Sequence, residues 1–163
     1  MTGRSLPIEE LLPRLAETPS RLAALSAGLT PAQLRAAPAP GEWSANEVLA
    51  RLRACADMWG RGIADILAGE QPTLRAINPR TWIRQTDYPD LEWTPSLAAF
   101  ATQRAELLTR LESLQPADWS RSAIFTGAGA PLVRTVHSFA ERLARHERPH
   151  LKQIERIIKV VRG

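Results

Sequence analysis

The chain has 163 residues, 44% of them hydrophobic and 23% charged, which is the composition of a globular protein and excludes a wholly disordered one. No apolar run approaches the roughly 20 residues that cross a bilayer, and Glu9, Glu10 and Pro13 interrupt the one candidate signal sequence. We expect a single domain over residues 1–163, soluble and cytoplasmic, with no membrane partner.

The net charge of +4 does not by itself indicate a nucleic-acid-binding protein. The densest basic segment, residues 142–162, carries Glu147 and Glu155 among its arginines and lysines. Such alternation is typical of a solvated helix face with i,i+4 ion pairs. Neither a helix-turn-helix spacing nor an aromatic stacking platform is evident, so we expect no nucleic-acid partner.

The first predicted helix covers residues 6–29, where the leucines keep helical spacing. Thr18 followed by Pro19 reads as a cap and a first-turn proline, which predicts a break or kink near Pro19. The helix is expected to end near Gly28. Thr30 and Gln33 form a capping box that begins a short helical turn.

The second predicted helix runs from about residue 45 to residue 68. Ser44 and Glu47 form a capping box at its start, and Gly69 is a plausible C-terminal cap. The single cysteine, Cys55, cannot form an intramolecular disulfide, which agrees with a reducing compartment. We expect its small side chain to be buried on this helix.

Residues 70–93 form a long connection in which three prolines exclude a long helix and leave room for a short one at residues 79–84. A connection of this length lets the second and third long helices run in the same direction. Two interpretations of its aromatic residues stay open: they pin the crossover over the end of the core, or they wall a ligand pocket. These residues are Trp82, Tyr88 and Trp93.

Two further helices complete the expected bundle. The third, residues 95–114, would be capped by Thr94. Residues 120–130 contain Gly127 and Gly129 and few apolar anchors, which predicts a mobile loop. The fourth helix is expected from about Pro131 to Val161.

Two segments resemble the DinB-like family of four-helix bundles. Trp43-Ser44 with Glu47 opens the second helix as in that family, and the segment from His146 through His150 to Ile154 is similar to its second motif. The resemblance implies an all-α four-helix bundle with a long crossover between helices 2 and 3. It also implies relatives that are divalent-metal-dependent transferases or isomerases using thiols such as bacillithiol or mycothiol, often as homodimers.

Typical members of that family hold the metal with three histidines, and here the first position is Arg51. His146 and His150 are four residues apart, so they share one helix face and could be two metal ligands. The Arg51 guanidinium stays protonated and cannot ligate a metal. A third ligand would have to come from Glu47 or Cys55. The expected cofactor is therefore a zinc or nickel ion that is held weakly or is absent.

Arg51 suits a different role, since its planar guanidinium can bind a carboxylate or phosphate in the same pocket. The alternative is that it pairs with Glu47 or Glu147 and only fills space. His146-Glu147-x-x-His150 also matches the zinc-protease pattern, but Pro149 and the short tail argue against that interpretation. His137 is interpreted as a surface or packing residue.

The sequence is compatible with three functions. The first is a DinB-like protein with a degenerate three-histidine site that binds a small or anionic ligand through Arg51. The second is an active metal-dependent thiol transferase in which His146 and His150 are ligands. The third is a non-catalytic, stress-related interaction protein. The first two require that Arg51, His146 and His150 share one cleft.

Overall fold

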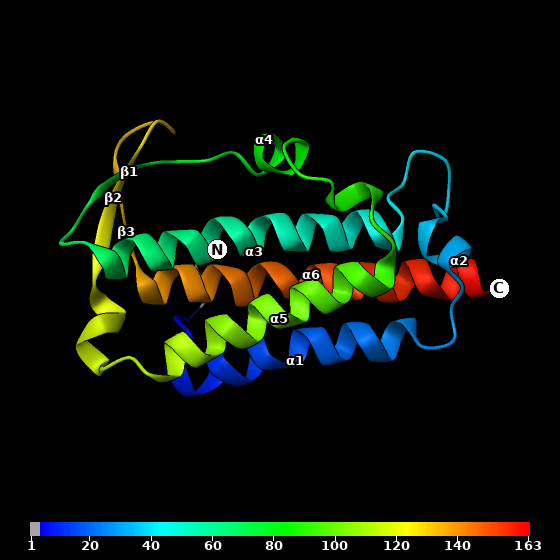
Figure 1. The fold of residues 1–163 in the computed structure, drawn as a ribbon, viewed down its shortest axis with the longest axis horizontal. Helices are drawn as coiled ribbons and strands as arrows, with labels where there is room; N and C mark the ends of the chain where they lie inside the picture. The colour runs from blue at the N-terminus through cyan, green and yellow to red at the C-terminus, as the bar shows by residue number, and fades with distance from the viewer. Residues whose placement is uncertain (1–3) are drawn as a thin grey trace.

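The structure, a computed structural model, describes residues 4–163 and consists of four long helices, short connecting helices and a small sheet (Figure 1). The long helices are α1 (Ile8–Ser26), α3 (Ala45–Ala68), α5 (Trp93–Glu112) and α6 (Val136–Arg162). Between them lie α2 (Pro31–Arg35), α4 (Pro79–Arg84) and the 3-10 turns η1 (Tyr88–Asp90) and η2 (Pro116–Ser120). The strands are β1 (Thr73–Arg75), β2 (Ser122–Thr126) and β3 (Leu132–Thr135).

The crossover between α3 and α5 decides the topology. Figure 1 shows α3 and α5 running in one direction and α1 and α6 in the other, with α4 lying on the outer side of α3. The predicted four-helix bundle with a crossover between its second and third long helices is therefore confirmed, and so is the short helix at residues 79–84.

Capping side chains set the start of α3 as predicted. The Glu47 amide donates to the Ser44 hydroxyl, and the Ser44 amide donates to the Glu47 carboxylate, both at 3.2 Å. Thr30 and Gln33 form the second predicted box at α2. The start of α5 differs, because that helix begins at Trp93 without a side-chain cap and Thr94 already lies inside it.

The predicted break of the first helix near Pro19 is wrong, while the alternative of a kink there stays a prediction. α1 is continuous from Ile8 to Ser26, with Pro13 and Pro19 inside it. Thr18 does not cap; it is buried, and its hydroxyl contacts the Arg14 carbonyl at 3.3 Å and donates to Glu147 Oε1 at 2.9 Å. Packing of the buried leucine stripe of α1 against α5 and α6 outweighs the backbone bonds that the prolines remove.

The segment predicted as a mobile loop is a β-hairpin. β2 pairs antiparallel with β3, with Ala123 opposite Arg134, and parallel with β1 of the crossover. Gly127 and Gly129 have φ of 94° and 84° and form the turn, since glycine adopts this backbone without steric cost. The fourth long helix therefore starts at Val136, not Pro131, because residues 132–135 are taken by the sheet.

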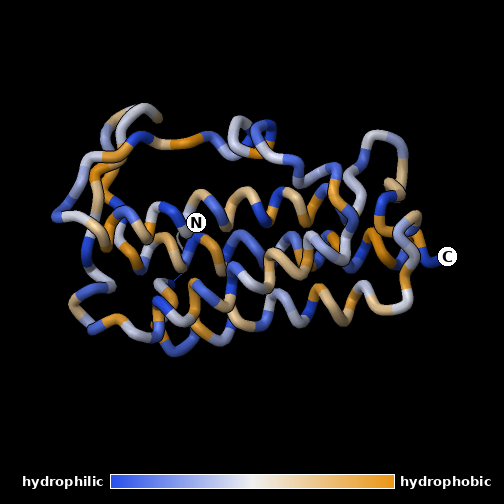
Figure 2. The backbone as a smooth tube through the Cα atoms, in the orientation of Figure 1, coloured by the Kyte–Doolittle hydropathy of each residue, from blue (hydrophilic) through white to orange (hydrophobic). Residues whose placement is uncertain are grey.

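Hydrophobic side chains of all four long helices meet in one core. Figure 2 shows hydrophobic residues recurring among hydrophilic ones along these helices. Cys55 is 1% exposed, as predicted. The core also holds one ion pair, Arg104 of α5 with Glu147 of α6, each 2% exposed. Arg104 donates to both carboxylate oxygens and to the Leu15 carbonyl, so the buried charges are matched by hydrogen bonds. Within residues 4–163 no helix has both the length and the apolar character of a membrane span.

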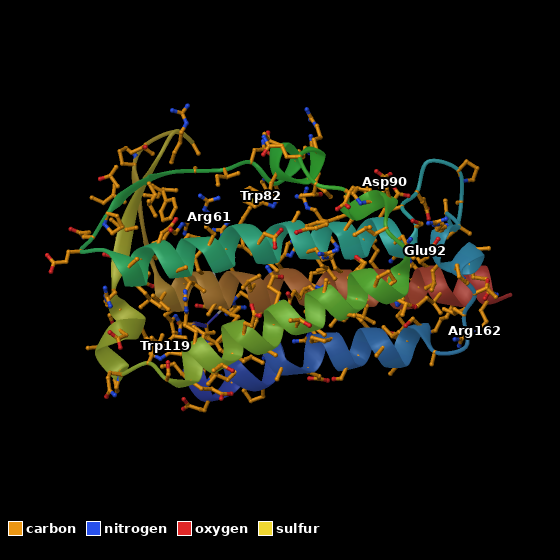
Figure 3. All side chains as sticks on the ribbon, viewed as in Figure 1. Arg61, Trp82, Asp90, Glu92, Trp119 and Arg162 are labelled. Carbon is orange, nitrogen blue, oxygen red and sulfur yellow. The ribbon has the colours of Figure 1, made fainter. Side chains whose placement is uncertain are left out.

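Asp57 of α3 fastens the crossover. It accepts hydrogen bonds from Trp82 Nε1 at 3.1 Å, the Tyr88 hydroxyl at 2.5 Å and Gln103 Nε2 at 2.5 Å. Figure 3 shows Trp82 between α4 and α3. Burial, followed by Asp57, raises the pKa of Tyr88 to about 12. Trp82 and Tyr88 thus pin the crossover as one interpretation predicted, along the flank of α3 and not over the end of the core.

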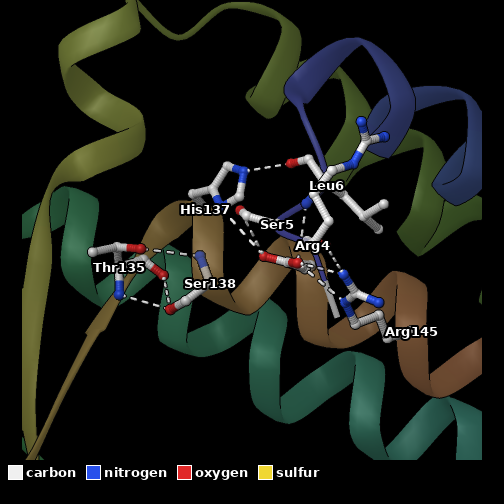
Figure 4. Close-up of polar contacts among 8 residues, drawn as sticks. Arg4, Ser5, Leu6, Thr135, His137, Ser138 and Arg145 are labelled. Atoms are coloured by element: carbon white, nitrogen blue, oxygen red, sulfur yellow. Dashed lines mark hydrogen bonds and ion pairs between the residues drawn. The ribbon is translucent and has the colours of Figure 1, made fainter. Parts of the chain in front are cut away.

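His137 and Glu141 of α6 hold residues 5 and 6 against that helix, and Figure 4 shows His137 beside Leu6. His137 Nε2 donates to the Leu6 carbonyl at 2.7 Å, and the Leu6 amide donates to Glu141 at 3.1 Å. Arg145 donates to the same carboxylate at 3.1 Å. His137 is therefore a packing residue, as the sequence indicated.

Candidate functional site

His146 and His150 lie on the face of α6 that looks toward α3. Their Nε2 atoms are 3.2 Å apart and their ring centroids 4.5 Å apart. Pro149 stands between them on the exposed side, and α6 continues through it. The four-residue spacing that the sequence offered is thus realised as two imidazoles in contact.

Two residues of α3 close the site around His146. Cys55 Sγ is 3.7 Å from His146 Nε2, and the Trp59 ring meets the imidazole edge-on at 5.0 Å between centroids. Burial, followed by the nearby His150, Arg51 and Arg142, lowers the pKa of His146 to about 4, so the ring is neutral at pH 7. Burial raises the pKa of Cys55 and Arg51 only partly offsets it, so the cysteine is a thiol.

Hydrogen bonding assigns the protons on the two rings. His150 Nδ1 contacts Gln153 Oε1 at 2.9 Å and must be the donor there, because an amide oxygen only accepts. Neutral His150 then accepts from His146 at Nε2. This leaves His146 Nδ1 buried without a hydrogen-bond partner among residues 4–163.

Arg51 and His150 line the same cavity, which has a volume of about 440 Å³. The α4 helix of the crossover covers it and supplies Arg80, Ile83 and Arg84, and Trp43 completes the wall. No carboxylate lines this cavity. Within the described chain none of the three arginines forms a salt bridge, so its positive charge is uncompensated.

The alternative in which Arg51 pairs with Glu47 or Glu147 is wrong, because Arg51 forms no salt bridge with either within residues 4–163. Glu47 binds the Ser44 amide in the capping box, and Glu147 points into the core to Arg104. Arg51, His150 and His146 instead form one continuous cluster, because Arg51 and His150 share a cavity and His150 contacts His146. Their roles in binding remain a prediction.

The donor set does not fit a divalent metal. Residues 4–163 contain no group of three histidine, cysteine or carboxylate side chains arranged to hold one. Two metal-bound imidazoles would each need a proton on Nδ1 and an acceptor for it, and His146 Nδ1 has none. Arg51, which adds positive charge where a third ligand would be required, also opposes a cation.

The zinc-protease interpretation is excluded by the position of Glu147. In that class of enzyme the glutamate acts as general base beside the metal. Here its carboxylate points into the core, where Arg104 and Thr18 occupy both of its oxygens. It cannot reach a substrate at His146 or His150.

Arg80 and Arg84 are the site residues that sequence reasoning missed. They are four residues apart, and the short helix at 79–84 was predicted, so their shared helix face was accessible from the sequence. What the sequence lacked was the path of the crossover, which brings that face over Arg51.

Comparison with known proteins agrees with this architecture. The family model described as the DinB superfamily matches residues 14–154. A solved structure of YfiT from Bacillus subtilis superposes with a TM-score of 0.80 at 18% identity, covering 98% of this chain and 91% of that one. It is described as a probable metal-dependent hydrolase with an unusual four-helix bundle topology. Among curated proteins no sequence matches the chain. With the family model spanning most of its length, the chain belongs to the DinB superfamily.

Proposed function

We propose that the protein binds a small anionic metabolite, carrying at least one carboxylate or phosphate group, in the cavity between α3, α4 and α6. The observation that supports this is the lining: Arg51, Arg80 and Arg84 converge there without a carboxylate or salt bridge. An anion would relieve their mutual repulsion, and guanidinium groups bind planar oxyanions through two parallel hydrogen bonds.

His150 would complete the site as a hydrogen-bonding group. Its Nδ1 is held by Gln153, which fixes the orientation of the ring beside Arg51. An anion beside the imidazoles would favour the protonated form of His146, whose pKa is about 4, so this contribution to the affinity is expected only well below neutral pH.

Thermal unfolding in inorganic phosphate and in succinate tests the proposal. A ligand that binds only the folded state stabilises it by about 2.7 kcal/mol at a concentration of 100 times its Kd. Arg51→Gln should weaken binding roughly tenfold, because one charge-assisted contact is lost. Arg156→Gln on the exposed side of α6 is the matched control and should leave binding unchanged.

Absence of an Arg51-dependent stabilisation by either anion would count against this function. It would favour the third hypothesis, an interaction protein without pocket chemistry. A gain in stability that Arg51→Gln and Arg156→Gln reduce equally would show only general screening of the basic surface.

The metal-dependent thiol transferase is the second candidate. It is supported by the 3.2 Å separation of the two Nε2 atoms, by Cys55 beside them, and by the description of the similar Bacillus protein as a probable metal-dependent hydrolase. It requires the site to rearrange, because the described residues supply neither a third ligand nor an acceptor for His146 Nδ1. Metal analysis after incubation with zinc or nickel tests it. Stoichiometric metal that is lost in His146→Ala/His150→Ala would support this candidate, while metal-free wild type would remove it.

A further inference from the structure

A second cavity of about 400 Å³ lies between α3, α6 and the sheet. Its floor is aromatic and aliphatic. Phe125 of β2 and Phe139 of α6 meet edge-on with centroids 5.2 Å apart, and Trp59, Leu74 and Leu132 extend the apolar surface. Gly62 allows this packing, because a Cβ there would lie 3.1 Å from the Phe139 ring. The cavity size suits a ligand with a flat apolar body.

Arginines surround this apolar floor. Arg61, Arg75, Arg134 and Arg142 line the cavity, against one carboxylate, Asp65. None of the four forms a salt bridge within residues 4–163. Arg142 lies over the Trp59 ring at 5.6 Å, and Figure 3 shows Arg61 beside α3 beneath the crossover. Partial burial and the neighbouring Arg134 lower the pKa of Arg142, as expected for two cations without a counter-ion.

We propose that this cavity binds an amphipathic organic anion, with a flat apolar body on the phenylalanine floor and its carboxylate or sulfonate between Arg134 and Arg142. The occupant is a small molecule, because a cavity of about 400 Å³ lined by three different elements has the size of a small-molecule site. A purely apolar ligand would leave the arginines uncompensated. A purely polar anion would leave the aromatic floor uncovered.

This site is distinct from the Arg51 cavity. The two share no lining residue, and Trp59 with His146 lies between them, since Trp59 lines the second cavity and contacts His146. The proposal therefore stands or falls independently of the proposed function.

Fluorescence titration with 8-anilinonaphthalene-1-sulfonate tests the inference, with the uncharged N-phenyl-1-naphthylamine as the matched probe. Arg134→Gln and Arg142→Gln should each weaken binding of the sulfonate roughly tenfold and leave the uncharged probe unchanged. Leu132→Ser should weaken both probes; Leu132 is 45% exposed, so the fold tolerates the change. Arg51→Gln is the control and should affect neither probe.

Two results would overturn the proposal. One is sulfonate affinity that neither arginine variant changes, which would place the probe elsewhere on the surface. The other is a loss in Arg51→Gln as large as in Arg142→Gln, which would show that the two cavities are one site. Circular dichroism of each variant establishes that the bundle is intact.

Discussion

Consecutive residues of α6 enter two opposite electrostatic environments. Glu147 turns into the core, where Arg104, Thr18 and the α5–α1 packing satisfy its carboxylate. His146 turns toward α3 and the crossover, where Arg51 adds positive charge and one ring nitrogen has no partner within the described chain. Both regions contain an arginine from a neighbouring helix. Arg104 has Glu147 as its counter-ion, whereas Arg51 has none within the described chain.

This difference separates a structural charge from one available to a ligand. The Arg104 guanidinium has a carboxylate and a carbonyl as acceptors, so binding anything else would cost an existing contact. The Arg51 cavity has three guanidinium groups and no carboxylate in its lining. A folded protein tolerates such a concentration of like charge only where solvent or an anion reaches it.

The largest effect on the free energy of unfolding should come from breaking the Arg104–Glu147 ion pair. Arg104→Met leaves the Glu147 charge buried without a counter-ion, so we expect the free energy of unfolding to fall by about 3–5 kcal/mol in urea denaturation. Arg104→Met/Glu147→Met removes both charges and should recover most of that loss. A double variant as unstable as the single one would mean that packing, and not charge, governs this position.

The second prediction concerns stability against pH. The pKa of His146 is about 4 in the folded protein and about 6.5 in the unfolded chain. Between these values the unfolded chain binds more protons, so the free energy of unfolding rises with pH from 4 to 6.5 and the full contribution is present at pH 7. We expect roughly 1–3 kcal/mol, reduced from the full shift by solvent in the neighbouring cavity.

Urea denaturation at several pH values measures this slope, and His146→Phe should remove its contribution. His137→Phe is the matched control variant, measured in the same way. The His137 ring lies near the start of α6, where it binds the Leu6 carbonyl. A slope in the wild type that persists unchanged in His146→Phe would show that another group titrates there.

A smaller effect on the free energy of unfolding is expected at Asp57, which binds the crossover to α3. Asp57→Asn removes the charge that three donors share, which should lower the free energy of unfolding by about 1–2 kcal/mol. The pKa of Tyr88 should fall from about 12 but stay above its ordinary value, because burial is the larger cause. Tyr88 is the only tyrosine in the sequence, so an ultraviolet titration reports it directly.

Local signals in the sequence predicted the parts of the fold that local contacts determine. Ser44 and Glu47 are three residues apart, and the bonds between them need no other segment, so the start of α3 was predictable to the residue. The prolines of the crossover likewise limited it to one short helix. The family resemblance predicted the crossover topology. Hydrophobic periodicity alone locates the helices but does not give their arrangement in the bundle.

Contacts between distant segments account for what the sequence did not predict. Residues 122–126 and 132–135 form strands because β2 pairs on both sides, with β1 and with β3. The glycine turn between them, taken alone, looks like a loop. α1 stays helical through Pro19 because its leucine stripe is buried. The histidine pair followed from helical spacing, whereas Arg80 and Glu147 acquire their roles from helices far away in the chain.

The smallest expected effect on stability comes from replacing Arg51, the arginine without a counter-ion. Arg51→Gln removes an arginine from α3 that makes no salt bridge, so the free energy of unfolding should stay within about 1 kcal/mol of wild type or rise. The pKa of His146 should increase from about 4, because Arg51 is one of the charges that lower it, while burial keeps it below the ordinary value. Imidazole resonances followed by NMR against pH measure this shift. If Arg51→Gln destabilised the bundle as much as Arg104→Met, then Arg51 would be a structural cation and its cavity would have no charge to offer a ligand.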